Sequence, residues 1–276
     1  MIVLITGCRS GFGQHIALRA ARAGHTVYAG LRDLRTADGL VAAAAGLPVH
    51  PIALDVCVDA DRKAAVAHIL AKHGRIDALI NNAGVALGGP LEDLDEDELR
   101  HLFEVNVFGL WALTNLVLPG MRAQGSGIIE NMSSISGRMA LPGLGAYAAS
   151  KHALEGMTEA LRVEVAPFGV RVVLIEPGPY KTDILGRNRT LGRRATSPDS
   201  PYADLSRRAE ALFTKVSQTA EDPEEVAARC VDLLTEAAPA LRHPMGKSAR
   251  ARILARWALP AAAFEGVMKL ALSRAG

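Results

Sequence analysis

Short apolar runs alternate with longer segments of helical periodicity over most of the chain. Residues 2–6 form an apolar, β-branched run without polar alternation, which is typical of a parallel strand covered on both faces. The residues from Gln14 to Arg22 place small apolar side chains on one side, which predicts a helix that stops at Gly24. A strand followed by a helix is therefore the first unit of the pattern.

The same pattern continues to about residue 175. Further strands are predicted over 27–30, 49–55, 78–81, 127–132 and 170–175, and helices over 60–73, 95–121 and 147–166. Strands separated by helices indicate right-handed crossovers, and hence an α/β fold with a Rossmann-type, doubly wound parallel sheet. No internal repeat or low-complexity linker interrupts the pattern, so residues 1–276 are expected to form a single domain.

The character of the chain changes after Pro177. Residues 186–208 hold six arginines among Gly, Ser and Pro, which suits a mobile loop better than a packed element. Helices are predicted near 202–216 and 223–236. The last segment, within a C-terminal helical tail over 245–276, is basic and then apolar, and Pro260 interrupts it.

Composition and charge narrow the class of protein. The chain is 49% hydrophobic and 22% charged, which is ordinary for a globular protein, and its net charge of +2 excludes a strongly basic nucleic-acid-binding protein. Cys8, Cys57 and Cys230 lack the spacing of a zinc site or of a disulfide framework, so we expect no metal centre. We find no leader segment and no uninterrupted apolar run of ~18 residues, and we expect a cytoplasmic protein.

A glycine-rich turn joins the first strand to the first helix. Residues Thr6–Gly13 have the sequence TGCRSGFG. Glycine permits a tight turn and a close approach of the backbone to a pyrophosphate, and the following helix N-terminus offers unpaired N–H groups. The turn therefore predicts a dinucleotide site with contacts from Gly7, Arg9, Ser10, Gly11, Phe12 and Gly13.

The end of the second strand distinguishes NADP(H) from NAD(H). An acidic residue there would bond the ribose 2′-hydroxyl of NAD and repel a 2′-phosphate. This sequence has Arg32 at that point and no carboxylate before Asp33. Arg32, helped by Arg9 or Ser10, would bind a 2′-phosphate as a bidentate cationic partner. We therefore favour NADP(H), with NAD(H) as the alternative.

Further motifs follow the glycine turn in a fixed order. They are Asp55–Val56, Asn81–Gly84, Asn106–Val107, Ser133–Ser134, Tyr147–Lys151 and Pro177–Gly178. In order and spacing the set resembles the short-chain dehydrogenases/reductases of the TGxxxGxG type, over residues 2–183. Tyr28–Asp33 and Ala153–Gly156 are similar, with less specificity, to the 17β-hydroxysteroid and retinol dehydrogenase-like members. The resemblance implies an oxidoreductase acting on a ketone or aldehyde and the corresponding alcohol, as a homodimer or homotetramer.

The pair Tyr147 and Lys151 carries the predicted chemistry. At a spacing of i and i+4 on a helix, both side chains project from one face. A free tyrosine has a pKa near ~10, and a nearby ammonium favours the phenolate and lowers that pKa. Tyr147 would then give a proton to a carbonyl oxygen or accept one from an alcohol, and Lys151 would also orient the nicotinamide ribose.

The resemblance assigns roles to two more residues. Ser134, at the end of a predicted strand, would hold the substrate oxygen and stabilise charge that develops there. Asn106 falls inside a predicted helix, an unfavourable place for asparagine. The resemblance implies that its side chain and a local backbone irregularity hold a water molecule that links Lys151 to solvent.

The remaining cofactor contacts are expected at the C-terminal ends of strands, where open α/β sheets bind ligands. Asp55 and Val56 would meet the adenine, and Asn82, Ala83 and Gly84 its ribose. Pro177, Gly178, Tyr180 and Thr182 would approach the nicotinamide carboxamide. Within that last segment, Pro179, Tyr180 and Lys181 replace residues that are usually small or apolar in the family.

The substrate is expected to meet residues 86–90, 136–145 and 184–215. Apolar side chains there indicate a pocket for a hydrophobic substrate, similar to a steroid, retinoid or lipid, unless they pack into the loop's own core. These side chains are Met139, Leu141, Leu144, Ile184, Leu185 and Leu191. The arginines at 187–194 would meet either an anionic substrate or, as we favour, solvent.

Some alternatives stay open. The tail, with Arg250, Arg252 and Arg256 before Trp257 and a run of apolar residues, would lie on a membrane surface, cover the substrate site or join an oligomer, which we favour. The same fold also serves non-catalytic, nucleotide-sensing proteins, which we expect to lack the Tyr/Lys pair. Epimerases and dehydratases of this fold usually show a different glycine spacing.

Overall fold

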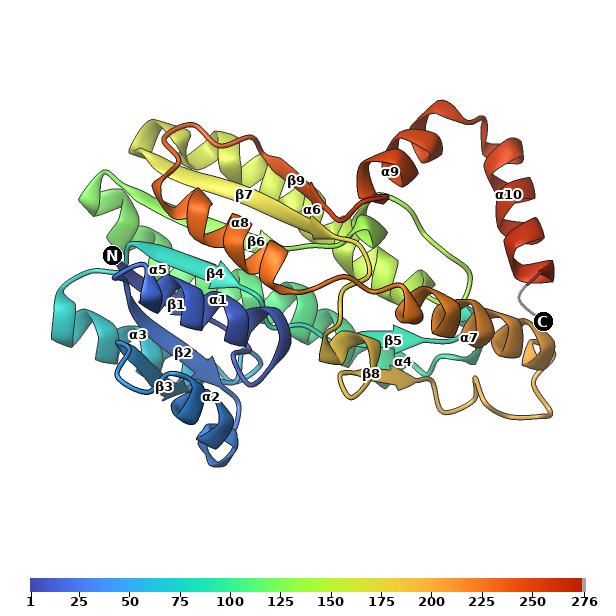
Figure 1. Ribbon diagram of the computed structural model, residues 1–276, viewed down its shortest axis with the longest axis horizontal. Coiled ribbons are helices and arrows are strands. Elements are labelled where there is room, and N and C mark those ends of the chain that lie inside the picture. Colours follow the sequence, from blue (N-terminus) through green and yellow to red (C-terminus); the bar gives the residue numbers. More distant parts are fainter. Residues whose placement is uncertain (275–276) are drawn as a thin grey trace.

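The fold is built on one twisted parallel sheet, and the computed structural model describes residues 1–274 (Figure 1). Seven strands lie in the order β3-β2-β1-β4-β6-β7-β9, and a separate parallel pair is formed by β5 and β8. The strands are β1 Ile2–Ile5, β2 Thr26–Leu31, β3 Val49–Ala53, β4 Ala78–Asn81, β5 Ala86–Gly88, β6 Gly127–Met132, β7 Val170–Pro177, β8 Arg189–Leu191 and β9 Arg242–Met245. The strand order reverses between β1 and β4, where doubly wound sheets open a ligand-binding crevice.

Helices cover both faces of the sheet, as the α/β prediction requires (Figure 1). They are α1 Gly11–Arg22, α2 Asp38–Ala43, α3 Asp59–His73, α4 Glu96–Phe103, α5 Gly109–Gln124, α6 Gly145–Val165, α7 Ala203–Gln218, α8 Glu224–Thr235, α9 Ala249–Ala258 and α10 Ala261–Ser273. Val3 and Ile5 of β1 pack with α1 and α8, whereas Leu4 packs with α3, α5 and α6. This burial on both faces explains the unbroken apolar runs of the central strands.

The sequence pattern missed the seventh strand, β9. Its four residues, RHPM, include Pro244 and show no apolar run. Proline removes a donor from the hydrogen-bond ladder and is confined to edge strands. β9 is such an edge strand, and within residues 1–274 its only strand partner is β7, with Leu174 opposite Arg242. The neighbouring strand, rather than a local pattern, therefore defines this element.

Residues 186–208 differ from the mobile loop that their composition predicts. The β8 strand pairs with β5. Arg189 forms a bidentate ion pair with Glu210 of α7, in which Arg189 Nη1 donates to Glu210 Oε2 over 2.8 Å. Arg193 donates to Asp95 over 2.9 Å. Ion pairs with carboxylates of distant elements hold these arginines in place, so the prediction of a mobile loop is wrong for this part of the segment.

A long helix crosses one face of the sheet. It runs over Glu96–Gln124, as α4, a π-helical segment and α5, and agrees with the helix predicted over 95–121. This helix is long enough to span a membrane, and its most apolar stretch of 18 residues has a mean hydropathy of 1.4. Half of that stretch, however, is buried inside the domain. It packs against α3 and α6, which is the environment of a core helix.

Candidate active site

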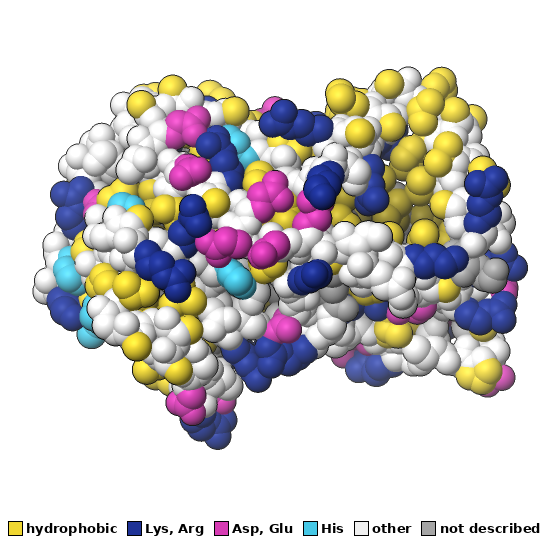
Figure 2. All heavy atoms as spheres, viewed as in Figure 1, with side chains coloured by type: hydrophobic (Ala, Val, Ile, Leu, Met, Phe, Trp, Pro, Cys, Tyr) yellow, Lys and Arg dark blue, Asp and Glu magenta, His cyan; other side chains and the backbone are white. Residues whose placement is uncertain are grey.

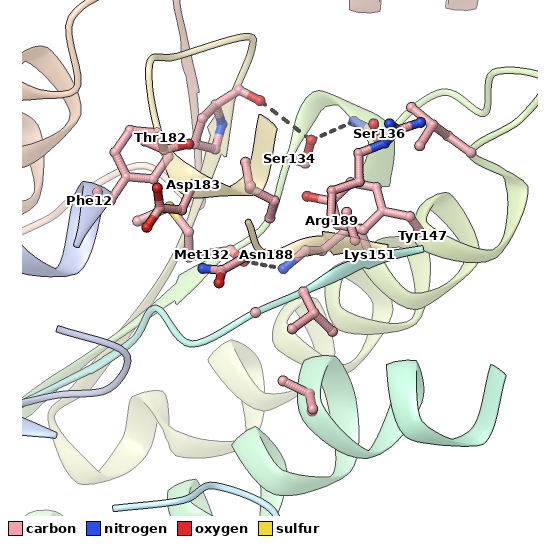
Figure 3. Close-up of a pocket in the computed structure, with 18 of the residues that line it drawn as sticks. Phe12, Met132, Ser134, Ser136, Tyr147, Lys151, Thr182, Asp183, Asn188 and Arg189 are labelled. Atoms are coloured by element: carbon pink, nitrogen blue, oxygen red, sulfur yellow. Dashed lines mark hydrogen bonds between the residues drawn. The ribbon is translucent and has the colours of Figure 1, made fainter. Parts of the chain in front are cut away.

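One cavity of about 680 Å³ extends along the carboxyl ends of the sheet strands. It begins at the turn after β1 and ends between α7 and α10, and Figure 3 shows the part around Tyr147 and Lys151. Most predicted site residues line it: Gly7, Arg9, Ser10, Gly11, Phe12, Arg32, Asp55, Val56, Asn82, Ala83, Gly84, Ser134, Tyr147, Lys151, Pro177, Gly178 and Thr182. Gly13, Asn106 and Tyr180 lie outside the lining.

Hydrogen bonds join the glycine turn to the end of β4. Thr6 Oγ1 accepts hydrogen bonds from the N–H groups of Asn82 and Ala83, at 3.0 and 2.9 Å. Gly7 has φ of +72°, and a Cβ atom there would lie 2.9 Å from the Ala83 Cα. At Gly13 a Cβ would lie only 2.4 Å from the Gly7 carbonyl oxygen. Gly13 therefore has a packing role, which brings α1 close to the turn, and its expected cofactor contact stays a prediction.

The start of α1 fits a pyrophosphate. The N-cap residue, Ser10, makes no side-chain capping bond, so within residues 1–274 the first N–H groups of α1 have no capping partner. These groups and the positive end of the helix dipole favour an anion in the crevice. The turn and the helix start thus fit the phosphates of a dinucleotide.

The far end of the crevice, after β2 and β3, carries the residues predicted to select the cofactor. Arg32 is exposed and lines the cavity. Asp33 accepts hydrogen bonds from the backbone N–H of Arg35 at 2.9 Å and from its guanidinium at 2.8 Å, which holds the pKa of Asp33 below its ordinary value. The nearest carboxylate is therefore occupied by Arg35, whereas Arg32 has no ion-pair partner among residues 1–274.

Tyr147, Lys151 and Ser134 meet at the centre of the cavity (Figure 3). The first two lie on the buried side of α6, and Lys151 Nζ is 5.8 Å from the centre of the Tyr147 ring. Lys151 Nζ donates to the Met132 carbonyl oxygen over 2.8 Å. The Ser134 hydroxyl accepts from the N–H of Ser136 at 3.1 Å, which directs this side chain from the end of β6. The structure therefore brings the three side chains together, as the sequence spacing predicts.

Asn106 occupies an irregular helical segment, as expected. It lies within the π-helical residues Glu104–Phe108 and is fully buried. Its side chain accepts from the Val85 N–H and donates to the Val85 carbonyl oxygen, both at 2.9 Å, and it donates to Ser150 Oγ at 3.1 Å. A Cβ on Gly84 would lie 3.4 Å from Asn106 Oδ1 and 3.6 Å from Lys151 Nζ, so the two side chains are neighbours. The water link to Lys151 stays a prediction.

Burial controls the protonation of the Tyr/Lys pair. It raises the pKa of Tyr147 to about 12, although the Ser134 hydroxyl acts in the opposite direction. It also lowers the pKa of Lys151 to about 8, against the attraction of the Glu155 carboxylate. The lowered tyrosine pKa expected from the spacing is therefore not reached by the protein alone, because desolvation of the phenolate outweighs the hydrogen bond of the Ser134 hydroxyl.

Tyr180 does not reach the site. Its side chain is buried between α1 and α8, where the hydroxyl donates to Glu225 Oε2 over 2.8 Å. Its ring meets the Phe12 ring edge to face, with 5.5 Å between centres. A partner on α8 holds the Tyr180 side chain away from the cavity, and the expected contact of this residue with the nicotinamide stays a prediction. Thr182 does line the cavity.

The substrate end of the cavity includes residues that the sequence did not single out. Met139, Leu141, Leu144 and Ile184 line it as predicted, whereas Leu191 borders a second, smaller cavity. The Leu185 side chain lies outside the described part of the structure. Additional lining comes from His101, Leu212, Phe213, Arg252, Met268, Ala271 and Leu272. The spacing of Met268, Ala271 and Leu272 marks one helix face, the one signal that could have revealed α10 as part of this site.

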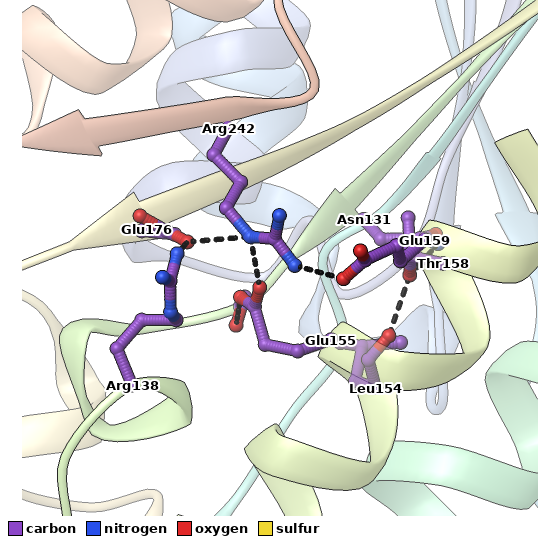
Figure 4. A network of polar contacts seen from close by, with 9 residues as sticks. Asn131, Arg138, Leu154, Glu155, Thr158, Glu159, Glu176 and Arg242 are labelled. Atoms are coloured by element: carbon purple, nitrogen blue, oxygen red, sulfur yellow. Dashed lines mark hydrogen bonds and ion pairs between the residues drawn. The ribbon is translucent and has the colours of Figure 1, made fainter.

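A largely buried charge network connects Glu155 of α6 with Arg242 and Glu176 (Figure 4). Glu155, one helical turn after Lys151, accepts from the Ser133 hydroxyl at 2.6 Å and from Arg242 Nε at 2.9 Å. Arg138 donates to the fully buried Glu176 at 3.1 Å. Burial and the charge of Glu155 raise the pKa of Glu176 to about 7. The network joins α6, β7 and β9 and includes Ser133, the residue before Ser134, and sequence analysis did not anticipate it.

This network predicts that Glu155→Gln changes the pH response of the site. The Glu155 carboxylate raises the pKa of Lys151, so its removal would deprotonate the ammonium at lower pH. We expect the alkaline fall of kcat/KM to shift to lower pH. Glu159→Gln is the matched control, because Glu159 is exposed and also pairs with Arg242, at 2.6 Å. Identical pH profiles for both variants would contradict this positioning role.

The chain belongs to the short-chain dehydrogenase family, whose sequence profile matches residues 1–191. It is 38% identical over 273 residues to the uncharacterized oxidoreductase YusZ of Bacillus subtilis, with 97% of each chain covered. It is 36% identical to 3-ketodihydrosphingosine reductase of Bacteroides thetaiotaomicron, over 89% of this chain and 87% of the relative. Identity to human 17-beta-hydroxysteroid dehydrogenase type 1 is 38%, over 88% and 76% of the two chains.

Solved structures agree with this assignment. A short-chain dehydrogenase from Streptomyces avermitilis superposes with a TM-score of 0.81 at 38% identity, over 93% of this chain and 92% of that one. A short-chain dehydrogenase/reductase from Burkholderia phymatum, in complex with NAD, gives a TM-score of 0.78 at 28% identity, over 93% and 92%. The chain is thus an oxidoreductase of a family that binds nicotinamide dinucleotides.

Proposed function

We propose that this protein is an NADP(H)-dependent oxidoreductase that interconverts a ketone or aldehyde and an alcohol, with Tyr147 as the general acid and base. The observation that carries the proposal is the meeting of Tyr147, Lys151 and Ser134 in the cavity that begins at the glycine turn. A buried proton donor, a cation and a hydroxyl around one point match the demands of carbonyl reduction.

The residues divide the chemistry among them. A bound nicotinamide supplies or accepts the hydride at the carbon atom. The Ser134 hydroxyl donates a hydrogen bond to the substrate oxygen and stabilises the negative charge that develops on it. Tyr147, protonated at neutral pH because its pKa is about 12, transfers its proton to that oxygen. The Lys151 ammonium then stabilises the phenolate left on Tyr147. Alcohol oxidation runs through the same proton path in reverse.

We propose NADP(H) as the preferred cofactor. Arg32 extends from the end of β2 into the cofactor crevice, and Arg9 lines the same region. Asp33, the nearest acid, is paired with Arg35 at 2.8 Å, which leaves it little capacity to bind a ribose hydroxyl. A free guanidinium beside an occupied carboxylate favours a 2′-phosphate.

The change Arg32→Asp tests the cofactor preference. It removes a cation from the proposed phosphate site and adds a repelling anion, so we expect KM for NADPH to rise about 10- to 100-fold relative to KM for NADH. Arg22→Asp is the control, because Arg22 is exposed at the opposite end of α1. An unchanged NADPH preference in Arg32→Asp would show that the 2′-phosphate assignment is wrong.

We propose a hydrophobic carbonyl substrate. The substrate end of the cavity is lined by apolar side chains from the loop after β6, from α7 and from α10, among them Leu141, Phe213 and Met268. Two relatives have names that refer to a steroid and to a ketodihydrosphingosine. Apolar side chains together with polar groups such as His101 and Asn188 suit a steroid-, retinoid- or lipid-like ketone.

The first experiment is oxidation of NADPH and NADH by the purified protein with a panel of carbonyl compounds. The panel contains a steroid ketone, retinal, a β-ketoester and a small aldehyde. We expect turnover with NADPH and the best rates with large apolar ketones. Tight NADPH binding without turnover of any compound would favour a nucleotide-sensing protein instead.

We also propose a homodimer or homotetramer in the cytoplasm. Leu99 and Phe108, both on the helix over Glu96–Gln124, have exposed apolar side chains. Exposed apolar side chains of this size are suited to contact with a second copy. Light scattering during gel filtration measures the mass directly, and a monomer at working concentration would contradict the proposal.

A further inference from the structure

The last helices form an arm that stands away from the sheet. This C-terminal arm, defined as residues 246–274, contains α9 and α10 on either side of Pro260. Figure 1 shows α10 at the end of the molecule, well away from the strands. The base of the arm is anchored, because Ala249 and Ile253 pack against Ile135, the residue after Ser134. Beyond that base, α10 packs mainly against α7.

The arm exposes large apolar side chains. Trp257 is 70% exposed and Leu254 is 67% exposed, and Leu259, Val267 and Leu270 are exposed as well. Figure 2 shows apolar side chains gathered over this end of the molecule, around a recess between the arm and the body. Grouped apolar exposure of this kind is unfavourable in water and marks a surface that contacts another apolar phase.

The charge of the arm has one sign. Residues 246–274 contain six basic residues, Lys247, Arg250, Arg252, Arg256, Lys269 and Arg274, and one acid, Glu265. Within the described part of the chain, none of these six side chains forms an ion pair. Unneutralised cations beside exposed tryptophan and leucine are complementary to an anionic, apolar surface.

We propose that the C-terminal arm binds the surface of a bilayer that contains anionic lipids. Its apolar side chains enter the boundary between headgroups and acyl chains, and its basic side chains other than Arg252 meet the lipid phosphates. A second copy of this chain is a poorer partner for the arm, because a symmetric contact would bring two sets of six cations together. The arm lies on the membrane and does not cross it, because α9 and α10 are only 10 and 13 residues long.

The position of the arm connects the membrane to the cavity. The opposite face of α10, with Met268, Ala271 and Leu272, lines the substrate end of the cavity, as does Arg252 of α9. A hydrophobic substrate dissolved in the bilayer would therefore meet the cavity where the arm binds. This consequence rests on the proposed function, whereas the membrane contact itself does not.

Trp257 offers a direct measurement of the contact. The chain has two tryptophans, and Trp111→Phe leaves Trp257 alone in the exposed arm. Mixed with vesicles of phosphatidylcholine and phosphatidylglycerol, this variant should show a blue shift of emission and should co-sediment with the vesicles. Both effects should weaken with added salt and with vesicles of phosphatidylcholine alone. Equal binding to both kinds of vesicle, or no blue shift, would overturn the proposal.

Two sets of variants test which residues are responsible. Leu254→Glu with Trp257→Glu, and separately Arg250→Glu with Lys269→Glu, should each weaken vesicle binding by about tenfold or more. Val163→Glu is the control, because Val163 is 73% exposed on α6, outside the arm. Undiminished binding in both double variants would overturn the proposal, as would an arm-dependent dimer that excludes vesicles. The assay requires no turnover, so its failure and that of the proposed enzyme activity are distinguishable.

Discussion

Replacing Tyr147 by Phe is expected to lower kcat for carbonyl reduction by about 10²- to 10⁴-fold, the usual contribution of a positioned proton donor. The variant loses one hydroxyl from a buried ring that packs against Ala86 and Leu102, so the fold and the nucleotide crevice should persist. We therefore expect NADPH binding, followed by fluorescence titration, to change little. The loss should appear in kcat, because the proton is transferred only in the reaction itself.

The pH dependence gives a second readout of the same residue. The pKa of Tyr147 is about 12, so the hydroxyl is protonated through the neutral range and is ready to donate. Alcohol oxidation needs the phenolate, so its rate should rise with pH in the unmodified enzyme and lose that rise in Tyr147→Phe. Tyr202→Phe is the control, because the Tyr202 hydroxyl bonds Glu92 at 2.6 Å outside the cavity. Full turnover in Tyr147→Phe would refute the assigned role.

Glu130→Gln is expected to flatten the pH dependence of stability. Glu130 lies in the middle of β6, between Ile80 and Val173, and is fully buried, and in the described part of the chain neither carboxyl oxygen has a hydrogen-bond partner that meets the distance and angle of a normal bond. Burial raises its pKa from 4.5 to about 8, although Cys230 and the guanidinium groups of Arg171 and Arg229 act in the opposite direction. The folded protein therefore keeps a proton on Glu130 at neutral pH.

The sign of the effect follows from the raised pKa. Between pH 4.5 and 8 the unfolded chain has lost the proton and the folded chain has kept it. The free energy of unfolding therefore falls by about 1.4 kcal/mol per pH unit over this range, on the order of 5 kcal/mol in total. Glutamine has the shape of the neutral acid and cannot ionise, so the variant should match the parent at pH 4.5 and exceed its stability at pH 8.

Urea unfolding at several pH values between 4.5 and 8 measures this difference. Glu164→Gln provides the control, because Glu164 is exposed on the same domain and should leave the slope unchanged. If the free energy of unfolding depends on pH in the same way in Glu130→Gln and in the parent protein, the carboxyl is already ionised in the folded state. The linkage argument would then fail for this residue.

Local spacing was sufficient to predict the centre of the site. Tyr147 and Lys151 lie one helical turn apart, so any helix over this segment places them on one face. The glycine turn required only that a strand precede it and a helix follow it, and both are encoded in the residues beside it. The alternation of apolar strands with helices likewise predicted the class of fold, because its hydrophobic periods are local.

Side-chain direction in irregular segments could not be predicted. Tyr180 follows β7 as expected, but Glu225, distant in sequence, binds its hydroxyl and turns it from the cavity. Glu155 was visible one turn after Lys151, yet its importance depends on Ser133 and Arg242, which only folding brings near it. No local pattern reports such partners.

By itself, the sequence determined the α/β fold, the glycine turn and the Tyr147/Lys151 pair, because each depends on neighbours within a strand, a turn or a helix. Only the tertiary structure determined that β9 is an edge strand, that Arg189 forms an ion pair with Glu210 and that α10 lies beside the cavity. Those features depend on contacts between residues far apart in the chain. Their free energy comes from burial and charge pairing that exist only once the sheet has formed.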